Sequence, residues 1–167
     1  MPPWMTPGKD SILIAHISDL HFGSPGQTEC WETLASFMKT SVKPSLLLVT
    51  GDLVHTPHRD LYKRAKTDLD ALGVPYYVCP GNHDRHKEGN RLVSWLGRKK
   101  PWRETAAVFD NVFQPNIVGP EKMTSVSLGA FKIGLLGVDS SDNADYSARG
   151  YVADKFFPMI KKSVDQN

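Results

Sequence analysis

Three short apolar runs near the start of the chain are separated by two amphipathic segments, and this alternation constrains the fold more than any other feature. The runs cover 11–17, 45–50 and 74–79 and are rich in aliphatic and aromatic residues. Runs of this length and composition are typical of strands buried on both faces of a parallel sheet. The order strand, helix, strand, helix, strand predicts an α/β fold built on two right-handed βαβ units.

The two segments between these runs carry apolar residues at helical spacing. The first helix is expected within 27–41, and the second from about His58 until Gly73 stops it. Each should bury one face, because its apolar residues recur every three or four positions. The expected buried stripes are Trp31, Leu34, Phe37 and Met38 in the first helix and Leu61, Ala65, Leu69 and Leu72 in the second.

The second half of the chain has weaker patterns. Helices are expected over 90–100 and 104–113, and a final helix is expected within 152–164. Between them, 123–128 and 131–138 flank Gly129-Ala130, which predicts a hairpin whose second arm is a buried strand.

The chain has 167 residues, of which 40% are hydrophobic and 23% charged, as expected for one globular domain. We expect this domain to cover 11–167 and to follow an extension over 1–10. No window approaches the roughly 18 apolar residues that span a bilayer, and the extension has no signal-peptide pattern. These features predict a cytoplasmic protein without a membrane partner.

The charge and the cysteines exclude further classes of site. A net charge of +2 argues against a nucleic-acid partner, which requires a clustered basic surface. Cys30 and Cys79 form no C-x-x-C pattern. The sequence therefore indicates neither a disulfide framework nor a thiolate metal site.

Polar side chains of the metal-ligand type follow each of the first three predicted strands. The carboxyl ends of parallel strands meet at one edge of a sheet, where ligands bind in open α/β folds. A turn or a helix N-cap could explain any one of these residues, but not all of them together. They are Asp19 and His21 after the first run, Asp52 after the second, and Asn82, His83 and Asp84 after the third.

This donor set predicts a dinuclear metal centre. Asp19 and His21 can share one cation, and Asp52 can bridge it to a second cation held by Asn82. Oxygen and imidazole donors suit Mn, Fe, Zn or Mg. Two such cations, about 3.5–4 Å apart, would generate a hydroxide and stabilise the charge of an in-line displacement at phosphorus.

The leaving group of such a reaction needs a proton, which His83 could donate while Asp84 orients its ring. The other histidines are interpreted as structural or solvated. His16 lies within the first strand, where a hydrogen-bonded or packed side chain is expected. His55 and His58 follow Asp52 closely, so they either line the mouth of the pocket or, as is more common for loop residues, are solvated.

The segments I-S-D-L-H-F-G, T-G-D-L-V and P-G-N-H-D, in this order, resemble the first three signature blocks of the calcineurin-like metallophosphoesterases. The resemblance implies a sandwich of mixed β-sheets flanked by helices. It also implies that Asp19 and His21 bind the first metal, that Asp52 bridges and that Asn82 binds the second. His83 then resembles the leaving-group acid and Asp84 its partner. The opening block is most similar to the bacterial cyclic-nucleotide phosphodiesterase branch.

The chain departs from the family pattern in its second half. The family supplies a G-H block and a G-H-x-H block there, whereas the six histidines of this chain all lie within the first 86 positions. We therefore expect the amino-terminal portion of a metallophosphoesterase, incomplete at its C-terminus. Such a portion would leave an open sheet edge and apolar surface at Phe156 and Phe157 partly uncovered.

The sequence thus predicts a hydrolase that cleaves a phosphodiester or phosphomonoester by metal-bound hydroxide, acting on a small phosphorylated substrate such as a nucleotide. The missing histidine blocks argue against full activity of these 167 residues alone. The alternative is a truncated, non-catalytic domain that serves as a binding or interaction module. A nucleic-acid binder that uses the basic residues of 98–103 is a weaker rival at a net charge of +2.

Overall fold

The computed structural model describes residues 11–85, 102–119, 123–138, 140, 152 and 154–165. The expected helix over 90–100 lies outside these residues. Within the described part of the chain, no helix is both long enough and apolar enough to cross a membrane.

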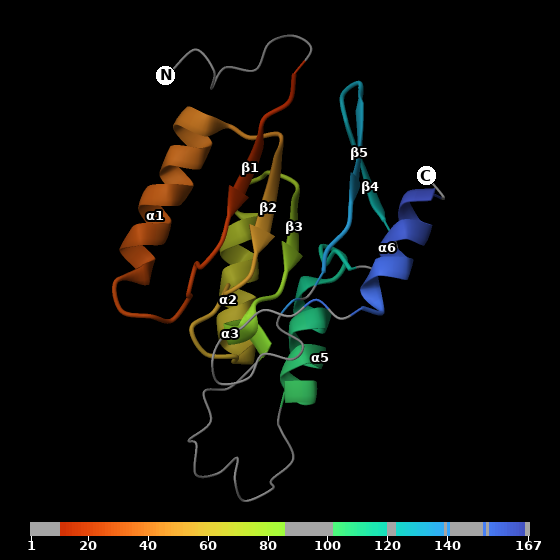
Figure 1. The fold of residues 1–167 in the computed structure, drawn as a ribbon. Helices are drawn as coiled ribbons and strands as arrows, with labels where there is room; N and C mark the ends of the chain where they lie inside the picture. The colour runs from red at the N-terminus through yellow and green to blue at the C-terminus, as the bar shows by residue number, and fades with distance from the viewer. Residues whose placement is uncertain are drawn as a thin grey trace, which may run out of the picture.

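A parallel three-stranded sheet forms the centre of the described fold (Figure 1). Its strands are β1 (Ile14–Ile17), β2 (Leu46–Thr50) and β3 (Tyr76–Cys79), in the order β1-β2-β3. The helices α1 (Gln27–Phe37) and α2 (Arg59–Asp70) connect them. This arrangement confirms the two βαβ units predicted from the sequence. Because both strand pairs are parallel, the carboxyl ends of all three strands lie at one edge of the sheet.

The two connecting helices begin and end close to the predicted positions. The ring of His58 caps α2 by accepting a hydrogen bond of 3.3 Å from the backbone N–H of Asp60. After α1 the chain makes a wider, π-helical turn over Met38–Val42, and this turn ends at Lys43 with a φ of 48°.

The helical stripes pack as predicted, with one exception. Trp31 and Met38 are buried, whereas Phe37 is 48% exposed. Phe37 follows Trp31 by six positions, which places it about 120° around the helix from Trp31. It therefore points away from the core that Trp31 and Met38 enter.

The second half of the described chain contains the predicted hairpin and two of the predicted helices. The strands β4 (Thr124–Leu128) and β5 (Phe131–Leu135) pair antiparallel, with Leu128 opposite Phe131 at the turn. Contrary to expectation, β5 is mostly exposed, because the described residues place little over it. The elements are α3 (Asn82–Arg85), α5 (Trp102–Phe113), β4 (Thr124–Leu128), β5 (Phe131–Leu135) and α6 (Phe156–Asp165).

The hydrophobic core lies on one face of the sheet. Val49 and Val78 point into it from neighbouring strands, and α2 lies behind them in Figure 1. Tyr62 of α2 is fully buried, and its ring packs edge-on against Phe109 of α5 with ring centroids 5.5 Å apart. This contact ties the two helices together behind the loops that follow β2 and β3.

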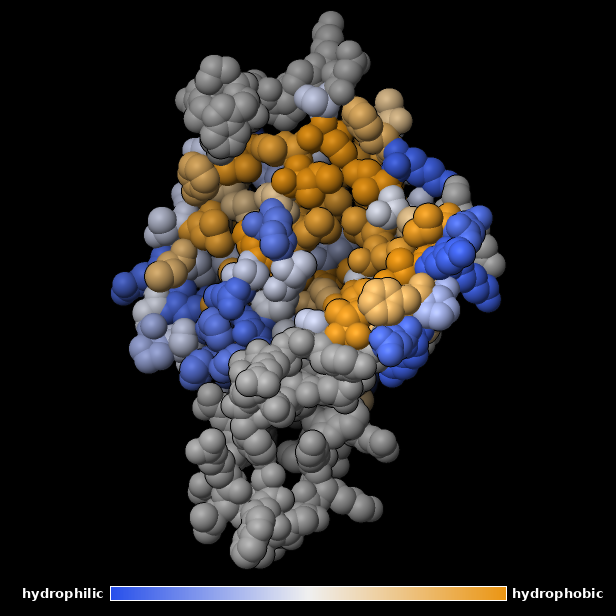
Figure 2. All heavy atoms as spheres, in the orientation of Figure 1, coloured by the Kyte–Doolittle hydropathy of each residue, from blue (hydrophilic) through white to orange (hydrophobic). Residues whose placement is uncertain are grey.

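The opposite face of the sheet is only partly covered by the described residues, so burial on both faces was a wrong expectation. Ile14 is 40% exposed, and His16 and Thr50 are exposed and joined by a hydrogen bond of 2.5 Å. Figure 2 shows hydrophobic residues gathered over the middle of this view, where β1 to β3 lie. Uncovered apolar surface was also expected at the C-terminal helix, and Phe157 is 59% exposed, although Phe156 is half-buried.

Candidate metal site

The backbone is left-handed at three of the predicted metal ligands. The φ angles are 57° at Asp19, 45° at His21 and 52° at Asp52, and among the other described non-glycine residues only Lys43 has a positive φ. Asp and His adopt this conformation more readily than most residues, but it still costs of order 1–3 kcal/mol at each position. Such strain is concentrated at functional sites, and here it occurs at three residues that share one edge of the sheet.

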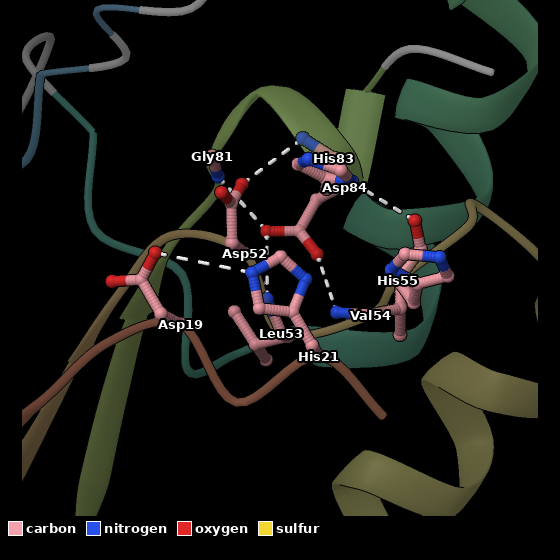
Figure 3. Close-up of polar contacts among 9 residues, drawn as sticks. All are labelled: Asp19, His21, Asp52, Leu53, Val54, His55, Gly81, His83 and Asp84. Carbon is pink, nitrogen blue, oxygen red and sulfur yellow. Dashed lines mark hydrogen bonds and ion pairs between the residues drawn. The ribbon is translucent and has the colours of Figure 1, made fainter. Parts of the chain in front are cut away.

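Backbone hydrogen bonds hold the loops after β1 and β2 side by side. The N–H of Asp19 donates to the carbonyl oxygen of Gly51 at 3.1 Å. The N–H of His21 donates to the backbone carbonyl oxygen of Asp52 at 2.9 Å. As a result, Asp19, His21 and Asp52 each place one ligand atom within 4.8 Å of the others (Figure 3). The three residues expected to lie around the first cation are thus brought together.

The loop after β3 approaches these two loops closely, and glycine makes the approach possible. A Cβ at Gly81 would overlap the carboxylate of Asp52 and lie 2.9 Å from the Cα of Gly51. Gly51 itself has a φ of 85°, a conformation that side chains rarely adopt. The loops after β2 and β3 therefore meet backbone against backbone.

Asn82 and His83 follow Gly81 directly and begin α3. The backbone N–H of His83 donates to Oδ1 of Asp52 at 3.0 Å, which orients this carboxylate within the cluster. Asn82 is half-buried beside it, at the same edge of the sheet. Its role as a second-metal ligand stays a prediction.

Asp84 does not orient the ring of His83, and this part of the sequence interpretation is wrong. Its fully buried carboxylate instead accepts backbone hydrogen bonds from Leu53 at 3.2 Å, Val54 at 3.0 Å and Gly81 at 2.9 Å. The side chain thus locks the loops after β2 and β3 to each other. Burial raises the pKa of Asp84 to about 6, although the three backbone N–H groups favour the charged form.

The ring of His83 is held by a different group. Its Nδ1 lies 2.9 Å from the carbonyl oxygen of His55. A carbonyl oxygen only accepts hydrogen bonds, so Nδ1 carries the proton and donates it. In the neutral ring, this leaves the lone pair on Nε2.

His55 is exposed, as expected of a loop residue, and it also lies beside two predicted site residues, which agrees with the alternative position at the mouth of the pocket. Its ring centroid lies 5.8 Å from that of His21 and 5.8 Å from that of His83, and the last two lie 4.9 Å apart. The available signal was its position three residues after Asp52 in a loop that follows a strand. His58, by contrast, caps α2 and does not join the cluster.

A family model for the calcineurin-like phosphoesterases matches residues 12–158 of the chain. A probable cyclic nucleotide phosphodiesterase of Moraxella catarrhalis is 36% identical over 84 residues, which are 48% of this chain and 30% of the relative. The glycerophosphodiester phosphodiesterase GpdQ of Enterobacter lignolyticus is 32% identical over 85 residues, or 44% of this chain and 30% of the relative. The chain thus spans about a third of the length of these relatives.

Among solved structures, the purple acid phosphatase PPD1 of yellow lupin matches with a TM-score of 0.56 and 16% identity. The match covers 97% of this chain and 29% of the phosphatase, and it confirms an α/β metallophosphoesterase-like fold over that part. Because the family model extends over most of the sequence, the chain belongs to the calcineurin-like phosphoesterase family.

Proposed function

We propose that the edge of the sheet that carries Asp19, His21 and Asp52 is a metal centre for the hydrolysis of a phosphodiester. The observation that supports it most directly is the convergence of these three side chains, whose ligand atoms lie within 4.8 Å of one another. Each stands on a left-handed backbone, a strained conformation that is concentrated at functional sites.

The donor chemistry fits a divalent transition metal. Two carboxylates and one imidazole suit Mn, Fe or Zn, and the carboxylates also suit Mg. The ligand atoms are close enough for one cation to be shared after small side-chain adjustments. We propose that Asp52 also contacts a second cation, together with Asn82, since Asp52 is anchored to the backbone of the loop that carries Asn82.

When bound, two divalent cations supply Lewis-acid stabilisation of phosphoryl oxygens and a lowered pKa for water. The chain's own residues hold the ligand atoms in place for this chemistry. Asp52 has one carboxylate oxygen fixed by the N–H of His83, which limits the rotation of its side chain. Backbone hydrogen bonds between the loops preorganise these side chains, which limits the reorganisation needed during the reaction.

We propose that His83 donates the leaving-group proton from Nε2. Its Nδ1–H is bonded to the carbonyl oxygen of His55, so Nε2 is the nitrogen that gains and loses a proton. The same hydrogen bond fixes the orientation of the ring, and so the direction in which Nε2 points. In this assignment the backbone of His55 performs the orienting task that the sequence assigned to Asp84.

A phosphodiester is favoured as the substrate because the relatives are named for cyclic nucleotides and glycerophosphodiesters. Hydrolysis of bis(4-nitrophenyl) phosphate with Mn²⁺ tests the proposal, and 4-nitrophenyl phosphate tests the monoester alternative. Wild type should hydrolyse the diester faster than the monoester, and Asp52→Asn should abolish both activities. Faster hydrolysis of the monoester would overturn the choice of substrate, and unchanged rates in Asp52→Asn would overturn the site.

The second candidate function is a non-catalytic binding module. It is favoured by the absence of histidine after position 86, since the later histidine blocks of the family have no counterpart in this sequence. Metal content separates the two functions: about two ions per chain favour the enzyme and none favours the module. Sequencing the source DNA past codon 167 adds a second criterion, because an in-frame continuation with G-H and G-H-x-H blocks would complete the ligand set.

A further inference from the structure

We propose that His21, His55 and His83 form a separate three-imidazole site for a zinc ion, next to the carboxylate site. Each of the three rings offers one nitrogen as a ligand atom, and these three nitrogens lie within 4.8 Å of one another. His55 belongs to none of the three family motifs in the sequence. The site shares His21 with the carboxylate site but uses neither Asp19 nor Asp52, so zinc binding to it can be tested without measuring hydrolysis.

His83 is prepared for metal binding by its hydrogen bond. The carbonyl oxygen of His55 accepts the Nδ1–H at 2.9 Å, which fixes the tautomer and the plane of the ring. Metal-binding histidines commonly donate their other ring N–H to a carbonyl or a carboxylate in this way. The remaining nitrogen, Nε2, is then an unprotonated ligand in the neutral ring.

His21 stands between the two groups of ligands. Its Nε2 lies 3.9 Å from Oδ1 of Asp19, whereas its Nδ1 is buried and has no hydrogen-bond partner among the described residues. Figure 3 shows the ring of His21 with Asp19 on one side and His55 on the other. A buried polar atom without a partner destabilises the fold. A metal ion bound to Nδ1 of His21 would give this atom a partner and remove that cost.

The ligand chemistry selects the ion. Three neutral imidazoles suit zinc, which commonly takes three protein ligands and leaves a fourth position for water. Mg²⁺ and Ca²⁺ prefer oxygen donors, so they should favour the carboxylates of Asp19 and Asp52. His55 is exposed, which gives an ion access from solvent.

The two sites share His21, so their ions should influence each other. A zinc ion at the three-imidazole site would also occupy Nε2 of His83, the atom that we propose gives up the leaving-group proton. Zinc binding there and proton donation by His83 are therefore mutually exclusive.

Zinc titration by calorimetry tests the proposal in an Asp19→Asn, Asp52→Asn background, which removes both carboxylates of the neighbouring site. Asn tolerates the left-handed backbone of both positions, and the amide introduced at position 52 keeps an oxygen for the N–H of His83. Into this background we would place His55→Asn and, as a matched control, His58→Asn. Asn is a good N-cap residue, so the control removes an imidazole three positions away without removing the cap of α2.

We expect His55→Asn to weaken zinc binding by about 100-fold, since even the loss of an outer-shell partner costs roughly 10–100-fold. His58→Asn should leave the affinity unchanged. Co²⁺ should give the intense visible absorption of a four-coordinate site in the background protein, and His55→Asn should abolish that absorption. Equal affinities of the two variants, or no zinc binding in the background, would overturn the proposal. Manganese binding by the chain with both carboxylates intact reports on the proposed hydrolytic site separately.

Discussion

Oδ1 of Asp84 accepts a hydrogen bond of 3.0 Å from the backbone N–H of Val54, which lies 30 positions earlier in the chain. The same carboxylate accepts from Leu53 and from Gly81, so one side chain joins the loops that carry Asp52 and Asn82. The main-chain carbonyl of Asp84 is held in turn by the hydroxyl of Tyr62 at 2.6 Å. Asp84 thus braces the two loops of the candidate metal site through their backbone, without being one of its ligands.

Replacing Asp84 with Ala should destabilise the fold strongly. The substitution leaves two buried backbone N–H groups and one partly buried N–H group without an acceptor, each at a cost of about 1–3 kcal/mol. We therefore expect the free energy of unfolding in urea to fall by at least about 3 kcal/mol. The control is Glu32→Ala on the exposed side of α1, which should change it by less than about 0.5 kcal/mol. A loss as small as that of the control would refute the bracing role.

The stability of the metal-free protein should depend on pH through Asp84. Its folded pKa, about 6, lies above its ordinary value of 3.8 because the carboxyl group is buried. Between these values the folded state binds a proton that the unfolded state has released, so this group lowers stability as the pH rises from about 4 to about 6.

The comparison that isolates this effect is wild type against Asp84→Asn, with chelator present. The difference in unfolding free energy, wild type minus variant, should decrease across that pH range, because the variant lacks the titrating group. A difference that stays constant, or that increases with pH, would contradict the raised pKa.

Gly81→Ala should disrupt the site through the backbone. The new Cβ would overlap the carboxylate of Asp52, so the loops after β2 and β3 must move apart. We expect a lower unfolding free energy together with weaker Mn²⁺ binding. Gly119→Ala is the matched control, because nothing lies within 4 Å of a Cβ at Gly119. Unchanged metal affinity in Gly81→Ala would show that the close approach of the loops is not needed.

Replacing His83 with Gln should slow hydrolysis according to the leaving group. An alkoxide needs a proton as it departs, whereas a nitrophenolate does not, and a general acid typically contributes about 10²–10⁴-fold. The ratio of rates on aryl and alkyl phosphodiesters should therefore rise by about 100-fold. Equal losses on both substrates would exclude His83 as the proton donor.

The elements that could be predicted from the sequence are those whose pattern is local. The apolar runs located β1 to β3, and helical spacing located α1, α2 and α6, because burial of one face imposes a period on the sequence itself. The convergence of Asp19, His21 and Asp52 also followed, since strand direction in two βαβ units fixes which ends meet.

The partners of individual side chains could not be predicted in the same way. Asp84 accepts hydrogen bonds from backbone groups about 30 positions away, and the carbonyl oxygen of His55 contacts the ring of His83 in another loop. Neither contact imposes a periodic pattern on the sequence. The exposure of Ile14 was missed for a related reason. An apolar strand has the same sequence pattern whether or not the described part of the chain supplies a second covering layer.

Metal content tests the central claim most directly. Wild type and Asp52→Asn would be equilibrated with Mn²⁺, freed of excess metal and analysed for metal and protein, with Asp60→Asn on the exposed surface of α2 as the control. The account predicts that wild type and the control retain about two ions per chain, while Asp52→Asn loses them because one carboxylate serves both. Equal metal content in all three proteins would contradict the assignment of Asp52 and, with it, the metal centre proposed at this edge of the sheet.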